Sequence, residues 1–172
     1  MTKYKLGQIG GVLILISMLF PISYISWVEY DYESYSWLFG IFYFRYVFNG
    51  TEHSEFYFTL QNLQHVRYSW EYMIIMLTIV FSCTILVAGI LIIISSTRDN
   101  GKNTLICAIL SIIAIIGYVF TNDFLFCFLL EYFETGVICV PRTYYILHIG
   151  FYGILIGGIL SMIGGIKSLK EL

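Results

Sequence analysis

Charged residues are scarce in this chain. They make up 12% of its 172 residues, against about 25% in a typical soluble domain. Its basic residues form no stripe, so nothing indicates nucleic-acid binding. The motifs H-E-x-x-H, G-x-S-x-G and G-x-x-x-x-G-K-[ST], which mark common hydrolases and phosphate-binding loops, do not occur. We therefore expect a protein that is not an enzyme and that uses no cofactor or small-molecule substrate.

Long apolar runs take the place of the missing charge, and hydrophobic residues reach 59%. Four runs have the roughly 20 residues that a helix needs to cross a bilayer. None carries a charge near its centre, where Asp, Lys or Arg costs about 2.5–3.5 kcal/mol. We predict an all-α membrane protein, a single domain over residues 1–172 built as a four-transmembrane-helix bundle, with spans at about 6–27, 72–95, 104–120 and 144–166.

The remaining charges are segregated along the chain. If the N-terminus is inside, the outer segments are about 28–71 and 121–143. The outer segments hold three basic residues and the inner segments hold six, namely Lys3, Lys5, Arg98, Lys102, Lys167 and Lys170. Because basic residues favour the cytoplasmic side, we predict a multi-pass protein of the plasma membrane with both termini in the cytoplasm. The sequon at Asn49 then lies outside, where glycosylation takes place.

The first outer segment predicts a β-hairpin. Asn49-Gly50 separates two runs rich in aromatic and β-branched residues, which is a strong signal for a two-residue turn. Such a turn sets Phe48 opposite Thr51 and Arg45 opposite Ser54, and makes Arg45 and Glu52 diagonal neighbours. The alternation over residues 29–33 is compatible with a third strand. Since a lone hairpin is marginally stable, its aromatic face needs further strands, helix ends or another chain.

Two cysteines, Cys127 and Cys139, lie in the second outer segment, where oxidation is possible. We predict a disulfide between them; the alternative is two unpaired thiols. Cys83 and Cys107 lie within spans and are expected to pack as small apolar residues. We also expect the third helix to continue beyond the bilayer to about Glu131.

The fourth span carries small residues at four-residue spacing, Gly153, Gly157, Ser161 and Gly165. Such a helix-packing face lets another helix backbone approach closely. Its partner is either another chain or the protein's own helices, for which Gly7 and Gly11 are candidates.

Histidines give little indication of a site. His148 has no second histidine or carboxylate at helical spacing, so a packed histidine is favoured over a proton or metal site. Alternation places His53 and Glu55 on one strand face and Glu52 on the other, so these ligands do not converge. We predict no metal site.

The whole pattern resembles the claudin and peripheral-myelin-protein superfamily. Trp37 precedes Gly40-Ile41-Phe42, where that family carries a tryptophan and a Gly-Leu-Trp triplet, and residues 63–67, ending at Arg67, are similar to its Leu-Gln-x-x-Arg. The family's two loop cysteines are missing here, and Arg45 stands where the first would fall. The resemblance implies a small extracellular antiparallel β-sheet from the first outer loop, placed on a four-helix bundle. It also implies a role in adhesion, barrier formation or support of another membrane protein.

Two functional hypotheses follow. The first is a claudin-like protein that mediates lateral or cell–cell association through its outer sheet, with the lipid bilayer and other membrane proteins or copies of itself as partners. The second is an accessory subunit of a larger channel, transporter or respiratory complex. A small pore or carrier is a weaker third hypothesis, because Thr78, Ser82, Ser111 and Ser161 are few and mild as pore-lining groups.

Overall fold

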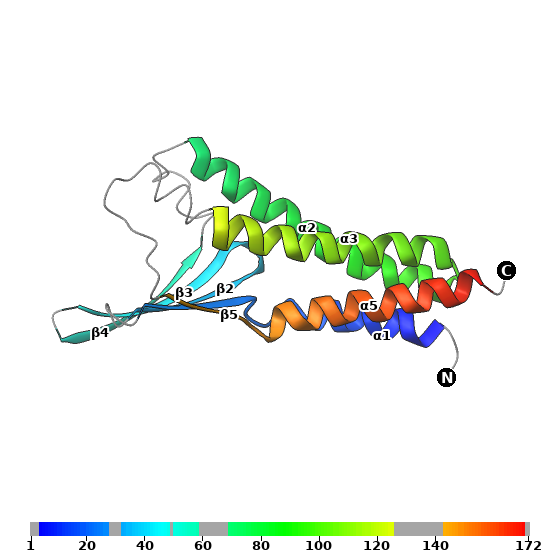
Figure 1. The fold of residues 1–172 in the computed structure, drawn as a ribbon, viewed down its shortest axis with the longest axis horizontal. Coiled ribbons are helices and arrows are strands. Elements are labelled where there is room, and N and C mark those ends of the chain that lie inside the picture. The colour runs from blue at the N-terminus through cyan, green and yellow to red at the C-terminus, as the bar shows by residue number, and fades with distance from the viewer. Residues whose placement is uncertain (1–3, 28–31, 49, 59–68, 126–142, 171–172) are drawn as a thin grey trace.

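The computed structural model describes residues 4–27, 32–48, 50–58, 69–125 and 143–170. Its helices are α1 (Tyr4–Ser17), α2 (Ser69–Thr97), α3 (Gly101–Val119) and α5 (Ile149–Leu169), with a short 3-10 turn η2 (Leu38–Gly40) and a π-helical turn η4 (Phe120–Leu125). Both chain termini lie at one end of the helices and a β-sheet lies at the other (Figure 1). We call these the terminal end and the sheet end.

In the described part of the chain, three helices are long and apolar enough to cross a membrane: Tyr72–Thr97, Gly101–Asn122 and Ile149–Leu169. The remaining helix, α1, has 14 residues and is shorter than that length. The predicted spans 72–95 and 104–120 coincide with α2 and α3 to within three residues at their ends. Three such helices are consistent with a membrane location.

Two predicted spans have the wrong extent. The span predicted at 6–27 is a helix only as far as Ser17, and Ser23–Trp27 form strand β1. The span predicted at 144–166 begins with strand β5 (Thr143–Leu147) before α5 starts at Ile149. The first helix cannot continue because Pro21 lacks the N–H that the next turn needs. In both spans the strand part, β1 or β5, satisfies its backbone groups by pairing with the other.

The four helices pack side by side in a ring. Helix α1 lies between α2 and α5, and α3 lies between the same two helices on the other side. The core between them contains mostly small and β-branched side chains, including Ile14, Ile85, Ala108, Ile115 and Ile154. Buried serines and threonines donate hydrogen bonds to carbonyls of their own helix, as Ser82 does to Thr78 O at 2.8 Å. Close helix contact therefore depends on small residues.

The sheet has five antiparallel strands in the order β4-β3-β2-β1-β5. Besides β1 and β5 it contains β2 (Tyr32–Trp37), β3 (Ile41–Phe48) and β4 (Thr51–Phe58). The predicted hairpin is confirmed in its register, because Phe48 pairs with Thr51 and Arg45 with Ser54. The sheet thus combines four strands from the first long loop with one strand that precedes α5.

The connections at the two ends of α3 differ. At the terminal end a tight turn joins two helices: α2 ends at Thr97, α3 begins at Gly101, and the Asn100 side chain accepts a hydrogen bond from Asn103 N at 3.1 Å. At the sheet end α3 continues as η4 to Leu125. Its predicted extension to Glu131 lies outside the described residues.

Candidate interaction surface of the sheet

One face of the sheet carries a row of large side chains that crosses all five strands. The register aligns Ile146, Tyr24, Tyr35, Tyr43 and Phe56 in this order, one from each strand. Neighbouring rings are in contact, with centroids 4.8 Å apart for Tyr24 and Tyr35, 6.3 Å for Tyr35 and Tyr43, and 5.0 Å for Tyr43 and Phe56. Phe56 and Ile146, at the two ends, are 64% and 54% exposed. We call these five residues the aromatic row.

A polar row follows two residues further from the helices on the same face. It consists of Ser26, Glu33, Arg45 and Ser54, again aligned across the strands. Arg45 lies between two carboxylates, with its Nη1 3.7 Å from Glu33 and its Nε donating to Glu52 Oε1 at 2.5 Å. This confirms the predicted diagonal contact of Arg45 and Glu52. The polar row bounds the aromatic row on the side away from the helices.

The electrostatics of this face follow from those contacts. The hydrogen bond and charge of Glu52, with the charge of Glu33, raise the pKa of Arg45 above its ordinary value. Partial burial, and then the nearby Glu33 carboxylate, raise the pKa of the Tyr35 hydroxyl. Both groups therefore keep their protons throughout the physiological range, so the face holds a neutral aromatic row beside a fixed cation.

The opposite face of the sheet is different. Ser23, Ser34 and Ser36 are buried there, and the hydroxyls of Ser23 and Ser36 share a hydrogen bond of 2.5 Å. The ring of His53 stacks on Tyr46, with centroids 5.3 Å apart. His53 and Glu55 lie on this face while Glu52 lies on the other, as alternation predicted. Within the described residues, no group of three His, Cys, Asp or Glu side chains is placed to hold a metal.

The loop motif on which the claudin resemblance rests, Trp37 with Gly40-Ile41-Phe42, lies where the sheet joins the helices. Trp37 ends β2, Gly40 ends η2, and Ile41 and Phe42 begin β3. The chain reverses through two consecutive residues of positive φ, Phe39 at 64° and Gly40 at 67°. Glycine adopts this conformation easily, whereas it is strained for phenylalanine.

Two hydrogen bonds fasten this turn to the helices. Phe39 N donates to Ser82 Oγ of α2 at 2.9 Å, and the hydroxyl of Tyr118 in α3 donates to Trp37 O at 2.5 Å. Leu38 and Tyr118 are fully buried. The sequence alone did not single out Ser82 or Tyr118 as anchoring residues. For Tyr118 the one signal was its position near the end of an apolar span. The turn fixes the sheet on the helix bundle.

His148 is placed between the sheet and α5. Its ring packs edge-on to Tyr35, with centroids 6.0 Å apart and planes at 79°. Its Nδ1 is buried and has no hydrogen-bond partner in the described part of the chain. The geometry is that of a packed histidine at the foot of the aromatic row.

The small residues of α5 face the protein's own helices. A Cβ on Gly157 would lie 2.7 Å from Gly10 O in α1, and one on Gly165 would lie 2.9 Å from Gly101 O in α3. Ser161 Oγ donates to Gly7 O at 3.4 Å, and a Cβ on Gly153 would meet the Ser17 side chain. Of the two partners considered for this face, α1 and α3 occupy it.

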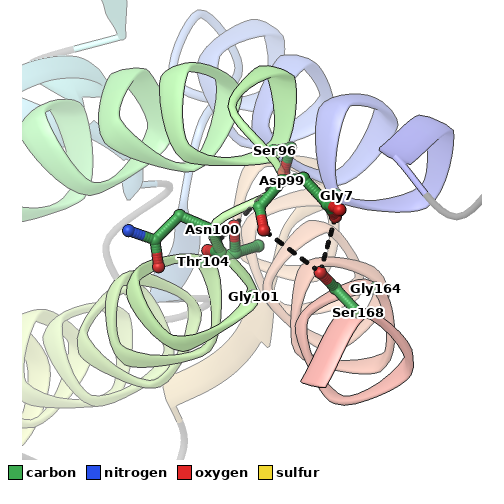
Figure 2. Close-up of a pocket in the computed structure, with 8 residues that line it drawn as sticks. All are labelled: Gly7, Ser96, Asp99, Asn100, Gly101, Thr104, Gly164 and Ser168. Carbon is green, nitrogen blue, oxygen red and sulfur yellow. Dashed lines mark hydrogen bonds between the residues drawn. The ribbon is translucent and has the colours of Figure 1, made fainter. Parts of the chain in front are cut away.

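A small polar cavity lies at the terminal end, where α1, α5 and the α2–α3 turn meet (Figure 2). Its lining is made of short side chains and glycines: Gly7, Ser96, Asp99, Asn100, Gly101, Thr104, Gly164 and Ser168. Ser168 Oγ donates to Asp99 Oδ1 at 2.7 Å. Its volume of about 10 Å³ has room for about one water molecule, so the cavity is a packing feature at a helix turn.

Several predicted site residues lie outside the described residues. They are Asn49 of the sequon, Arg67 of the loop motif, and Cys127 and Cys139 of the predicted disulfide. Those four assignments stay predictions. No protein-family model and no curated protein matches the chain.

Proposed function

We propose that this protein is a non-enzymatic, multi-pass membrane protein whose sheet binds other membrane proteins or copies of itself, laterally or between cells. In this proposal the terminal end, with Lys5, Arg98, Lys102 and Lys167, faces the cytoplasm and the sheet lies outside the plasma membrane. The excess of basic residues at the terminal end supports this orientation.

The observation that carries the proposal is the edge strand β4. It is the last strand of the sheet on its side, and Thr51–Phe56 are exposed apart from the half-buried His53. An edge strand presents a row of N–H and C=O groups to which another strand can pair. Within the described residues no further strand pairs with β4 on this side, so its backbone edge is the binding group in this proposal.

The length of the turn between β3 and β4 determines which N–H groups of β4 point away from β3. A two-residue turn joins Phe48 and Thr51 by a hydrogen bond, so that these two residues form a hydrogen-bonded pair. Pairs of this kind alternate along an antiparallel ladder, and the N–H groups of Thr51, His53 and Glu55 therefore point toward β3. The N–H groups of Glu52 and Ser54 point away from β3, and no strand in the described part of the chain pairs with them there.

The anchoring of the sheet also favours binding. Its connection to α2 and α3 through Phe39 and Trp37 holds β4 in a fixed orientation relative to the helices. A preorganised edge loses less conformational entropy on binding than a mobile loop. The small sheet on the ends of packed helices is also what the claudin resemblance implied, and in that family the sheet serves association.

The test removes the outward N–H at one position. Ser54→Pro lacks that group but breaks no bond to β3, because proline is tolerated where an edge strand faces solvent. Ser54→Ala keeps the N–H and is the matched control. We expect a tagged full-length chain, purified in gentle detergent, to retain its partners as wild type and as Ser54→Ala and to lose them as Ser54→Pro.

The partners are identified by mass spectrometry and by co-expression with a second, differently tagged copy. Recovery of the second copy alone identifies self-association. Unchanged recovery of all partners with Ser54→Pro would show that the β4 edge is not the binding surface. One larger membrane protein, recovered in fixed ratio and insensitive to Ser54→Pro, would favour the accessory-subunit hypothesis instead.

A further inference from the structure

The exposed face of the sheet changes in polarity step by step with distance from the helices. Nearest the helices lie Trp37 and Ile41, which are half-buried and apolar; then comes the aromatic row; then the polar row with Glu33 and Arg45. A membrane shows the same order from hydrocarbon to water, with tyrosine and tryptophan enriched at headgroup level. On this ground we propose that the aromatic row lies in the headgroup region of a phospholipid bilayer.

The exposed surface of α5 leads directly to the aromatic row. Exposed apolar side chains recur along one stripe of this helix: Ile149, Tyr152, Ile156, Ile159, Ile163 and Ile166. Ile149 is 62% exposed, and the next exposed apolar residue toward the sheet is Ile146 of the aromatic row. At the end of α1, Leu19 is 77% exposed. The surface that faces lipid along the helices thus has no polar break before the row.

The lengths of the elements place the row at the right height. From Lys167 to Ile149 the 18 steps of α5 rise about 27 Å, and three strand residues to Ile146 add about 10 Å. The total of about 37 Å exceeds the hydrocarbon core of about 30 Å but lies within the 40–45 Å that includes the headgroup regions. A helix tilt of about 20° reduces it to about 35 Å.

The same measure places the polar row at the outer limit of the headgroup regions. Glu33 and Arg45 lie two residues further along the strands than Tyr35 and Tyr43, which adds about 7 Å and gives about 44 Å. Their charges thus lie at the boundary with water, while His148, two residues nearer the helices than Ile146, is near the edge of the hydrocarbon. If this face bound a second protein and not lipid, its side chains would not need to become more polar step by step along the membrane normal.

The inference also explains why α1 is short. Its 14 residues rise about 21 Å, too little for the core. The crossing is completed by the segment from Met18 to Tyr24, whose strand part pairs with β2 and β5 and so leaves its backbone hydrogen-bonded. The backbone of this segment can therefore lie next to lipid, because the paired strands satisfy each other's N–H and C=O groups.

The experiment uses the full-length chain in phosphatidylcholine vesicles, with the photoreactive residue p-benzoylphenylalanine at one position at a time. The test positions are Phe56 and Ile146, at opposite edges of the sheet. Val47 is the control for height, because it is 42% exposed on the same face but four residues further out than Tyr43. Glu55 is the control for the face, because it neighbours Phe56 and points to the other side. Adducts are identified by mass spectrometry after illumination.

We expect phospholipid adducts at positions 56 and 146, in yields several times those at positions 47 and 55. Equal yields at all four positions, or an adduct with a second protein chain at position 56, would overturn the inference. The readout is separate from the Ser54→Pro test, since partner binding at the β4 edge and lipid contact of the aromatic row use different groups. Either one can fail while the other holds.

Discussion

The contact between α1 and α5 gives the sharpest test of the fold, through the substitution Gly10→Ala. A Cβ at Gly10 would lie 2.4 Å from the carbonyl oxygen of Gly157 and 2.8 Å from the amide nitrogen of Ser161. Both atoms belong to the backbone of α5 and cannot turn away. An ordinary contact of about 3.4 Å needs the helices to separate by about 1 Å, and such a gap forfeits a quarter to a half of each dispersion contact along the interface.

The expected loss follows from two opposing effects. Overpacking of a tight contact costs about 1–3 kcal/mol and occasionally more, while alanine gains about 1 kcal/mol over glycine in helix propensity. Because the obstacle is backbone, we expect the upper part of the first range and a net loss of about 2 kcal/mol in the free energy of unfolding. The measurement is equilibrium unfolding by sodium dodecyl sulfate in mixed micelles, followed by far-ultraviolet circular dichroism.

Gly89→Ala is the matched control. The three atoms nearest to its Cβ would be side-chain atoms of Leu15 and Ile14, the first at 2.9 Å. These tips can move, so we expect a change within about 0.5 kcal/mol. Adding Ser161→Gly to Gly10→Ala removes the hydroxyl but leaves the Gly157 carbonyl in place, so stability should not recover. Equal stabilities of Gly10→Ala and Gly89→Ala, or recovery in the double variant, would refute the argument from backbone contact.

Two further predictions concern tyrosines. Tyr118→Phe removes the hydroxyl that donates to Trp37 O and leaves that carbonyl without this partner, so the free energy of unfolding should fall by about 1–3 kcal/mol; an unchanged value in the same titration would show that the bond does not anchor the sheet. The raised pKa of Tyr35 means that the folded protein holds this proton more tightly than the unfolded chain, so its contribution is complete below the ordinary value of 10.0 and is lost as the pH rises above it. As the pH rises from 10 to the pKa of Tyr35 in the folded protein, the free energy of unfolding of Tyr35→Phe should therefore fall less than that of wild type. An equal fall in both proteins would contradict this reasoning.

The sequence predicted the local parts of the fold well. The apolar lengths of α2 and α3 and the register of the Asn49-Gly50 hairpin depend on neighbouring residues. So does the Arg45–Glu52 contact, which follows from the register alone. Each of these could be predicted because the residues that decide it lie within a few positions of one another.

The errors arose where distant segments decide the structure. Residues 22–27 and 143–147 carry no charge and directly adjoin apolar helices, and hydropathy alone cannot distinguish an uncharged strand there from the continuation of the helix. Strand β1 exists because β2 and β5 pair with it, and β5 lies more than a hundred residues away in the chain. The positive φ of Phe39 is a further case, since burial of η2 against α2, and not its residue type, imposes that conformation.

The candidate surface was predicted only in part. Alternation assigned Arg45 and Glu52 to one face, but the aromatic row needs the register of five strands, two of which, β1 and β5, lie in segments that had been predicted as helix. The row became visible only once Ile146 and Tyr24 were known to pair. If the first helix had been predicted to end at Pro21, the alternating pattern of the residues after it would have predicted a strand. Tyr24 would then have been identified as a first member of the aromatic row.

The junctions of strands and helices explain why the sheet and the bundle act as one unit. Ile22 N donates to Ser36 O at 2.7 Å, His148 N to Ile22 O at 2.8 Å, and Gly150 N to Pro21 O at 2.9 Å. The first amides of a helix have no partner within it, so the Pro21 carbonyl supplies one for α5. The β1–β5 ladder holds its two strands about 4.8 Å apart, which fixes the separation of α1 and α5 at the sheet end. A clash at Gly10 can then be relieved only by opening the terminal end, and for this reason its cost cannot be spread over the whole interface.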